Sequence, residues 1–234
     1  MKLTPEQIRQ RFDTDVERFA NLKTGQTATI DAPLVLELIS QAAAAVTPRA
    51  ASVLDIGCGA GNYTLKLLGV LPDLDVTLID LSQPMLARAC ERIRPVTRGT
   101  VAAVQGDVRG IDLGRERFDV ILAAMVLHHL REDAEWQDVF ARCHQALRPG
   151  GSIWIADLVW HDDPAVQQLL WRRYGDYLVG LRGQAYRDQV FTYIDREDTP
   201  RSLLFQVDLL CRVGFRKVEI LHKNSCFAAF GALK

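Results

Sequence analysis

Residues 53–64, Val-Leu-Asp-Ile-Gly-Cys-Gly-Ala-Gly-Asn-Tyr-Thr, place an apolar strand directly before three glycines at alternate positions and the start of a helix. Glycine tolerates positive φ and lets a ligand lie against the main chain, so Gly57, Gly59 and Gly61 predict a site with a backbone floor. The helix that follows would point unpaired N–H groups and its positive dipole end at that site. The segment therefore predicts a strand–loop–helix unit that holds a nucleotide-type cofactor.

Details of this loop distinguish between classes of cofactor. In the dinucleotide fingerprint G-x-G-x-x-G/A a third small residue packs the helix against the strand, but Asn62 stands at that position here. A Walker-type loop would end in Gly-Lys-Ser/Thr, which this sequence lacks. Asp55 precedes the loop, where a carboxylate would repel a pyrophosphate but could hold the ammonium of an amino acid or the water around it. The loop therefore favours a cofactor with an amino-acid end.

The length and composition are typical of one α/β domain. The chain has 234 residues, of which 48% are hydrophobic and 24% charged, enough to bury a sizeable core. A net charge of −1 provides no general attraction to nucleic acid. Five cysteines without C-x-x-C spacing predict free thiols and no metal site. With a polar N-terminus and no apolar run of about 18 residues, we expect a cytoplasmic protein that does not enter a membrane.

From residue 51 the sequence alternates between strand and helix patterns, which is typical of a parallel sheet with helices on both faces. Strands are expected at 52–56, 75–80, 100–105, 118–124 and 151–158. Helices are expected near 62–71, 83–94 and 132–147. Two further strands, at 216–221 and 225–233, are separated by so few residues that they should pair antiparallel.

Helical segments flank this alternation. Helices are expected over 4–20, from 31 to about 46, from Pro164 onward, and from Thr199-Pro200 to Val213. We therefore predict a single domain, residues 1–234, with an N-terminal helical lid at 1–30 and a helical insertion or lid at 160–200.

The pattern Asp-x-Gly-x-Gly-x-Gly at 55–61 resembles motif I of the class I S-adenosylmethionine-dependent methyltransferases. Residues 118–130, Phe-Asp-Val-Ile-Leu-Ala-Ala-Met-Val-Leu-His-His-Leu, are similar to the fourth-strand motif of that family. Leu-Arg-Pro-Gly-Gly at 147–151 is similar to the turn before its fifth strand. The resemblance implies a Rossmann-like, seven-stranded, mostly parallel sheet with an antiparallel C-terminal strand, and S-adenosylmethionine as the cofactor.

The same resemblance assigns the amino-acid end and the methyl group of the cofactor to two parts of the sequence. The amino-acid end would lie against Asp55, Gly57, Cys58, Gly59 and Gly61. The methyl group would lie near Ala124 and Met125, at the end of the fourth predicted strand.

Two aspartates follow successive predicted strands, where ligands of open α/β sheets bind. In the family resemblance, Asp80 would accept from the ribose hydroxyls, with Leu81 and Met85 covering one face of the adenine. Asp107 would accept from the adenine amino group while the Val108 N–H donates to a ring nitrogen. Either aspartate alone could be an ordinary helix cap or loop residue, but their joint position favours a cofactor site.

The outer segments, 12–31 and 174 to the C-terminus, are similar to the bacterial carboxy-S-adenosylmethionine synthases. This resemblance places Arg182 and Tyr186 near the carboxylate of a modified cofactor and implies a homodimer through residues 160–200. The Gly-Cys-Gly-Ala-Gly loop and the His-His pair depart from those enzymes and match an ordinary methyltransferase. An enzyme of tRNA wobble-uridine modification is the alternative, and a cofactor-binding protein without turnover is a third.

Methyl transfer from a sulfonium is an in-line displacement that needs a general base only when the acceptor arrives protonated. His128, where the fourth predicted strand opens, and Asp157, near the end of the fifth, are the candidate catalytic residues. Each has a structural alternative. The histidine, like its neighbour His129, could pack or hydrogen-bond within the core. Asp157 could cap the helix near Pro164, with Asp162 and Asp163 as rivals for that cap.

Aromatic and basic residues supply candidates for the substrate side of the pocket. These candidates are His128, Trp160, Arg182 and Tyr186. An aromatic residue at a strand end is often part of the core, and the 160–200 segment could instead form a solvated or dimer-contact face. Phe12 and Phe19, on the apolar stripe of the first predicted helix, would pack over the pocket or complete the core.

We therefore predict a methyltransferase that acts on a small molecule, in a pocket covered by the N-terminal helices and the insertion. Nucleic acid is not an expected partner, because no Asn-Pro-Pro-Tyr motif follows the fourth predicted strand and the sequence has no concentrated basic tail. The choice of acceptor depends on the shape of the pocket, and therefore on the side chains of the two lid segments.

Overall fold

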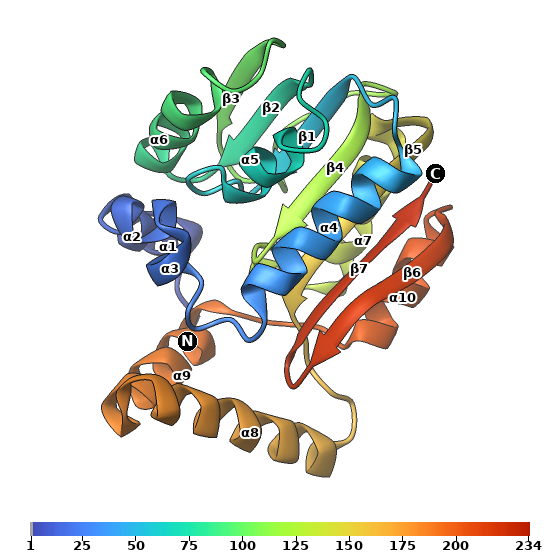
Figure 1. Ribbon diagram of the computed structural model, residues 1–234. Helices are drawn as coiled ribbons and strands as arrows, with labels where there is room; N and C mark the ends of the chain where they lie inside the picture. The colour runs from blue at the N-terminus through green and yellow to red at the C-terminus, as the bar shows by residue number, and fades with distance from the viewer. Residues whose placement is uncertain (1) are drawn as a thin grey trace.

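Across residues 2–234, which the computed structural model describes apart from the side chain of Lys23, seven strands form one sheet in the order β3-β2-β1-β4-β5-β7-β6 (Figure 1). The strands are β1 (Ser52–Ile56), β2 (Asp75–Asp80), β3 (Val101–Gln105), β4 (Phe118–Ala124), β5 (Leu147–Leu158), β6 (Arg216–Asn224) and β7 (Phe227–Leu233). The pairs among β3, β2, β1, β4 and β5 are parallel, whereas β7 pairs antiparallel with both β5 and β6. The predicted mostly parallel, seven-stranded α/β fold is confirmed.

The fifth strand starts earlier than expected. It begins at Leu147 and not near residue 151, because Leu147 pairs with Phe118 before the register between β4 and β5 shifts. The shifted part contains Pro149, which cannot donate to a strand ladder, and Gly150, which has a φ of 80°. The Arg-Pro-Gly-Gly turn is therefore built into the strand as a bulge.

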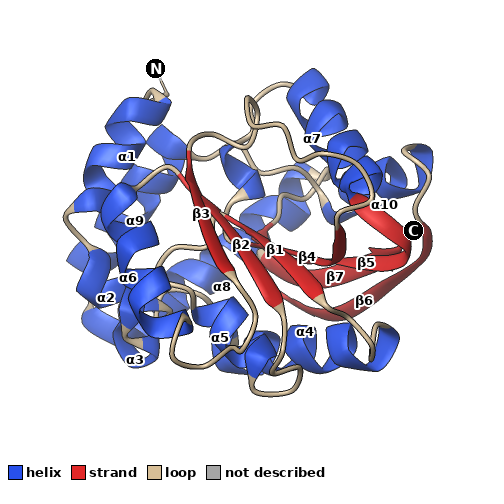
Figure 2. Ribbon diagram, turned by 90° about the horizontal axis from the view of Figure 1, so that it is seen from above, coloured by secondary structure: helices blue, strands red, loops and turns tan. Residues whose placement is uncertain are grey.

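Helices cover both faces of the sheet (Figure 2). One face carries α4 (Ala32–Val46), α5 (Asn62–Leu68) and α6 (Gln83–Ile93). The other carries α7 (Asp133–Ala146) and α10 (Leu203–Arg212). Ile39, Leu67 and Leu86 are buried in the core on the first face, and Trp136 and Leu210 in the core on the second. The sheet therefore lies between two apolar layers, as its buried parallel strands require.

The N-terminal segment is broken into short helices instead of the single helix predicted for 4–20. The helices are α1 (Pro5–Asp13), α2 (Val16–Ala20) and α3 (Leu22–Gly25). Thr4 caps α1 with the expected capping box. The helix ends because the Thr14 hydroxyl donates 2.9 Å back to the carbonyl of Arg11, a local bond that competes with helix continuation.

The insertion is a helical hairpin of α8 (Pro164–Arg182) and α9 (Gln184–Glu197) that lies beside the N-terminal helices (Figures 1 and 2). Asp163 caps α8 by accepting from two backbone N–H groups, so the alternative reading of Asp157 as this cap is wrong. The next helix, α10, begins later than Thr199-Pro200, because Ser202 supplies its cap. None of the helices described within residues 2–234, α8 included, has the length and apolar character needed to cross a membrane.

Candidate functional site

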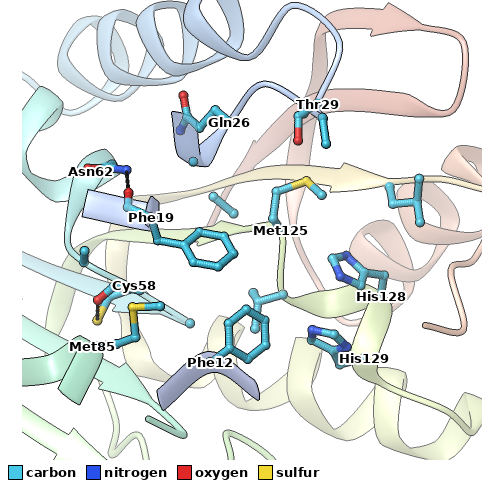
Figure 3. A pocket seen from close by; sticks show the side chains of 18 of the residues that line it. Phe12, Phe19, Gln26, Thr29, Cys58, Asn62, Met85, Met125, His128 and His129 are labelled. Atoms are coloured by element: carbon cyan, nitrogen blue, oxygen red, sulfur yellow. Dashed lines mark hydrogen bonds between the residues drawn. The ribbon is translucent and has the colours of Figure 1, made fainter. Parts of the chain in front are cut away.

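A cavity lies at the carboxyl ends of β1, β2 and β4, the edge where ligands of open α/β sheets bind (Figure 3). Its floor comes from the loop between β1 and α5 and from the ends of β2 and β4. The segment from α1 to residue 29 covers it, and Tyr174 of α8 and Tyr193 of α9 form part of a wall. Segments far apart in the sequence therefore meet around one space.

The glycine loop shapes the floor of this cavity in two different ways. A Cβ on Gly57 would lie 2.4 Å from a methyl carbon of Val126, so this glycine is required for close packing. A Cβ on Gly59 would meet no atom within 4 Å, although its φ of +51° disfavours other residues. The face of Gly59 is therefore open, as the backbone floor of a ligand site must be.

Asp55 presents a buried carboxyl group at the cavity. The residue is 1% exposed, and one carboxylate oxygen accepts a 2.6 Å hydrogen bond from the Thr64 hydroxyl. Burial, which outweighs the effect of Thr64, raises the pKa of Asp55 to about 7. A cationic group in the cavity would favour the ionised form of this carboxyl.

Asp80 joins the end of β2 to the glycine loop. One carboxylate oxygen accepts 2.8 Å from the Gly59 N–H and the other accepts 2.8 Å from the Ser82 N–H. Burial raises the pKa of Asp80, although these two N–H groups act against the shift. Each oxygen has a second lone pair, so the carboxylate can accept from a ligand while it holds the loop.

Asp107 and Val108 line a smaller cavity beside the first, and Asp80 and Leu81 line both. Burial acts to raise the pKa of Asp107, but its hydrogen bonds with Arg109, one of them 3.0 Å long, lower it overall. The sequence reading missed Arg109. The pair could have been predicted from the sequence, because Arg109 lies two positions after an aspartate at a strand end.

Met85, Ala124, Met125 and Cys58 also line the main cavity, where the family resemblance puts the adenine, the methyl group and the amino-acid end. Met125 has a φ of 53°, an uncommon left-handed conformation that costs free energy and that its 2.7 Å backbone bond to Ala156 helps to hold. Burial raises the pKa of the Cys58 thiol well above its ordinary value, so the thiol stays neutral. The floor here is apolar.

The two catalytic candidates form one buried pair. Asp157 contacts Nδ1 of His128 through one carboxylate oxygen and accepts from the His128 backbone N–H, 3.0 Å away, through the other. Asp157 itself does not line the cavity described across residues 2–234, whereas His128 does. Burial lowers the pKa of His128, but Asp157 and Asp198 outweigh it and raise the pKa to about 9.

Asp198, which the sequence reading missed, completes this corner of the cavity. It follows α9 and lies 3.2 Å from Nδ1 of His129 and 3.7 Å from Nε2 of His128. The Thr199 N–H donates 2.7 Å to the carbonyl of His128 and fixes the connection there. The sequence has an acidic residue here, directly after a helix. Because Thr199-Pro200 follows at once, the segment was interpreted as the start of the next helix, and Asp198 was not considered as a site residue.

The N-terminal helices supply the cover. Phe12 and Phe19 point into the cavity from α1 and α2 (Figure 3). The side-chain amide of Asn62 donates 2.8 Å to the carbonyl of Phe19 and so joins the glycine loop to this cover. The cover also includes Gln26 and Thr29, which the sequence reading did not single out.

Three of the residues expected at the substrate side lie outside the lining of the cavity as the structure describes it. Trp160 follows the end of β5 and is 45% exposed, with its ring 6.2 Å from that of Trp171. Arg182 stacks over the ring of Tyr186, 5.2 Å from its centroid, at the turn between α8 and α9. From the hairpin, Tyr174 and Tyr193 line the cavity, and Arg182 and Tyr186 do not.

Known proteins match this sequence. A family model described as a methyltransferase domain matches residues 53–151. A carboxy-S-adenosyl-L-methionine synthase of Chromohalobacter salexigens is 30% identical over 191 residues, which cover 79% of this chain and 68% of that protein. The chain belongs to the class I S-adenosylmethionine-dependent methyltransferase family. An uncharacterized methyltransferase of Geobacillus kaustophilus is 35% identical over 118 residues, which span 50% of this chain and only 52% of that relative.

Solved methyltransferase structures share the fold. The 1,6-didemethyltoxoflavin-N1-methyltransferase of Burkholderia thailandensis, solved with S-adenosylhomocysteine, superposes with a TM-score of 0.63 at 22% identity, covering 100% of this chain and 92% of that one. Human N-acetylserotonin methyltransferase, solved in complex with SAM, gives a TM-score of 0.61 at 17% identity, covering 97% of this chain but only 56% of that one. At such identities the likeness concerns the fold alone.

The residues of this family member fit the family's cofactor, S-adenosylmethionine, which supplies a methyl group bound to a positively charged sulfur. Gly59 leaves an open backbone floor, and the buried carboxyl of Asp55 suits an ammonium group. Asp80 has acceptor capacity left for hydroxyl groups, between the main cavity and the smaller one lined by Asp107. The two cavities thus offer three acidic acceptors: Asp55 suits the amino-acid end, Asp80 the ribose and Asp107 the adenine.

Proposed function

We propose that this protein transfers the methyl group of S-adenosylmethionine to a small-molecule acceptor. The observation that carries the proposal is a single covered cavity that runs from the glycine loop and Asp55 to His128 and His129. Phe12 and Phe19 extend over it from the N-terminal segment. Such a cover leaves space for a small acceptor and hinders the approach of a macromolecule.

The chain contributes chiefly by positioning the reactants. Asp55 and Asp80 would hold the amino-acid end and the ribose, while Met125 bounds the space near the methyl group. Phe12 and Phe19 would exclude water from that space. Holding acceptor and methyl group in contact can contribute up to ~7–11 kcal/mol to lowering the barrier.

We propose that His128 lies beside the acceptor. Its imidazole lines the cavity next to His129, on the turn that follows β4 (Figure 3). Asp157 holds the opposite edge of the ring from inside the core and is therefore a positioning residue. Replacement of Asp157 by Asn should change the orientation of the imidazole without removing it.

Calorimetry with purified protein tests the proposal. S-adenosylhomocysteine should bind, NAD should not, and Asp80→Ala should weaken binding at least about tenfold because the loop and the ribose lose a charged acceptor. Asp208→Ala removes an aspartate from an exposed ion pair on α10 and should leave binding unchanged. Tighter binding of NAD, or no binding of S-adenosylhomocysteine, would reject the proposal.

The alternative is an enzyme that modifies the cofactor itself, as the name of the Chromohalobacter relative states for that protein. The match over 79% of this chain favours it. The position of Arg182 and Tyr186, outside the cavity, does not support it. Mass spectrometry of ligand released from the purified protein distinguishes the two: a cofactor heavier by one carboxyl group supports the alternative, and plain S-adenosylmethionine or its demethylated product supports methyl transfer.

We also propose that the protein acts in the cytoplasm as a homodimer through residues 160–200. All five cysteines are free thiols, which suits a reducing compartment. Val166, Leu169 and Leu181 of α8 are exposed apolar residues, which suits a contact between two copies.

The net charge of −1 supports a small-molecule substrate over nucleic acid.

A further inference from the structure

Three side chains converge at one corner of the cavity with the chemistry of metal ligands. His128 and His129 lie on the short turn Leu127–His129 after β4, and Asp198 reaches them from the end of α9. One ligand atom from each residue lies within 4.8 Å of the others. All three residues line the cavity, so an ion between them would be accessible to a ligand there.

The spacings from Asp198 to the two histidines are close to those in the first coordination sphere of a transition metal. Bond lengths of about 2.1 Å place the ligand atoms of a tetrahedral ion about 3.4 Å apart, and neighbouring ligands of an octahedral ion about 3.0 Å apart. Asp198 Oδ1 lies 3.2 Å from His129 Nδ1 and 3.7 Å from His128 Nε2. The two imidazole nitrogens lie within 4.8 Å of each other, so the histidine rings would move together when an ion binds.

Two of the converging atoms lack partners. Within the described part of the chain, Nδ1 of His129 and Oδ1 of Asp198 are buried without a hydrogen bond and meet each other only in an ion-pair contact of 3.2 Å. Asp198 is only 5% exposed. Buried polar atoms are normally satisfied by hydrogen bonds, and a metal ion between this carboxylate oxygen and this imidazole nitrogen would satisfy both.

A further carboxylate orients one of the histidines. Asp157 contacts Nδ1 of His128 and also accepts from the backbone N–H groups of His128 and Leu158, so its own position is fixed. The contact at Nδ1 leaves Nε2 as the free nitrogen, on the side of Asp198. Histidines that bind metals are commonly held in this way by a carboxylate on their other nitrogen.

We propose that His128, His129 and Asp198 bind a divalent transition-metal ion, with Asp157 as the positioning residue. Two imidazoles and one carboxylate favour Zn²⁺, Fe²⁺, Co²⁺ or Mn²⁺ over Mg²⁺ and Ca²⁺, which prefer all-oxygen sites. Three protein ligands leave at least one coordination position open toward the cavity. On the basis of the proposed methyl transfer, that position selects acceptors with an anionic or chelating oxygen next to the methylated atom.

Titration of metal-free protein with Co²⁺ tests the site independently of activity, because bound Co²⁺ has a visible absorption spectrum that depends on its ligands. One ion per chain should bind. Both His129→Gln and Asp198→Asn should weaken binding at least about 100-fold, and Asp157→Asn should weaken it about 10–100-fold. His161→Gln changes a histidine outside the cavity and should bind as the wild type does.

Two outcomes would overturn the proposal: no binding at millimolar Co²⁺, or binding that the His129 and Asp198 variants leave unchanged, which would indicate adventitious surface histidines. Loss of Co²⁺ binding supports the site only for folded variants, so the circular dichroism spectrum and the unfolding midpoint of each variant should match those of the wild type. If the wild type does not bind S-adenosylhomocysteine, the proposed function is contradicted instead. The Co²⁺ titration still tests the metal site in that case, because it does not depend on the cofactor.

Discussion

At the scale of single residues, Asp55 couples the protonation state of the protein to its ligand. Burial raises its pKa to about 7, so at pH 6 most molecules carry a neutral carboxyl beside the cavity. An ammonium group bound there favours the carboxylate. We therefore expect S-adenosylhomocysteine binding to release a proton at pH 6 and much less at pH 8. Calorimetry in two buffers of different protonation enthalpy measures this number of protons.

Asp55→Asn is the control for this release and should abolish it. The same pKa affects folding. Between the ordinary aspartate pKa of 3.8 and the folded value of about 7, the folded state binds more protons than the unfolded state, so this group's contribution to stability falls as the pH rises through that window. Asp55→Asn should therefore gain stability relative to the wild type at pH 8 but not at pH 4. Equal proton release by wild type and variant would contradict the role of Asp55.

A substitution at Gly59 can affect ligand binding at the cavity floor and can also strain the backbone, and the two effects can be measured separately. Gly59→Ala adds a methyl group that meets no protein atom but faces the space where the cofactor would lie. It should reduce S-adenosylhomocysteine affinity at least about tenfold while lowering the free energy of unfolding by only about 1–2 kcal/mol, the cost of alanine at positive φ. Calorimetry and urea denaturation measure the two effects.

Gly150→Ala is a matched control, because Gly150 also has a positive φ, +80°, and also faces open space, but it lies on the β5 bulge away from the cavity. It should lose similar stability and no affinity. If both variants lose the same affinity, the effect comes from the backbone, and Gly59 has no direct role in the floor.

At the scale of elements, the arrangement of strands could be predicted because each buried parallel strand is a short apolar run bounded by Gly, Pro or Asp. The ends of elements depend on competing local bonds. The Thr14 hydroxyl ends α1 and Ser202 delays α10, and neither bond changes the apolar pattern from which the elements were predicted. The β5 bulge likewise depends on pairing with β4, a contact absent from the local sequence.

The N-terminal cover is attached to the rest of the molecule by several contacts, and one of them is a partly buried ion pair. Arg11 of α1 donates 2.8 Å to Glu197 at the end of α9, and the Glu197 side chain is only 2% exposed. Arg11→Met leaves that carboxylate buried and unpaired, a change that typically costs ~3–5 kcal/mol. We expect faster hydrogen exchange in α1 to α3 and weaker S-adenosylhomocysteine binding, both measurable on the purified variant.

Arg9→Met is the matched control on the same helix. Arg9 pairs with Glu6 and Asp13 within α1, and such local surface pairs contribute little to stability. Its exchange rates should stay close to those of the wild type. Equal acceleration in both variants would mean that loss of helix charge, and not the bond to α9, loosens the cover.

At the scale of the whole molecule, the sequence predicts the cofactor loop well but does not predict the cluster of His128, His129 and Asp198. Asp55, Gly59 and Asp80 lie within one strand–loop–helix–strand stretch, so local pattern and family resemblance were enough to bring them together. Asp198 meets His128 because the α8–α9 hairpin returns the chain to the cavity, which Tyr174, Tyr193 and Asp198 line; no spacing in the sequence encodes this long-range contact. In the same hairpin Arg182 and Tyr186 stack on each other at the turn and do not line the cavity, contrary to the prediction from the sequence.

The α8 helix of this hairpin has an exposed apolar face that could join two copies of the protein. Leu169 on α8 is 55% exposed and Val166, one turn earlier, is also exposed, so a second copy could bury this apolar face. We expect the protein to sediment as a dimer and Leu169→Arg to sediment as a monomer, because a charge would be buried without a partner. Leu204→Arg is the control, since Leu204 is 71% exposed on α10, outside residues 160–200, and should leave the dimer intact. A monomeric wild type, or dissociation by both variants, would contradict a dimer contact through α8.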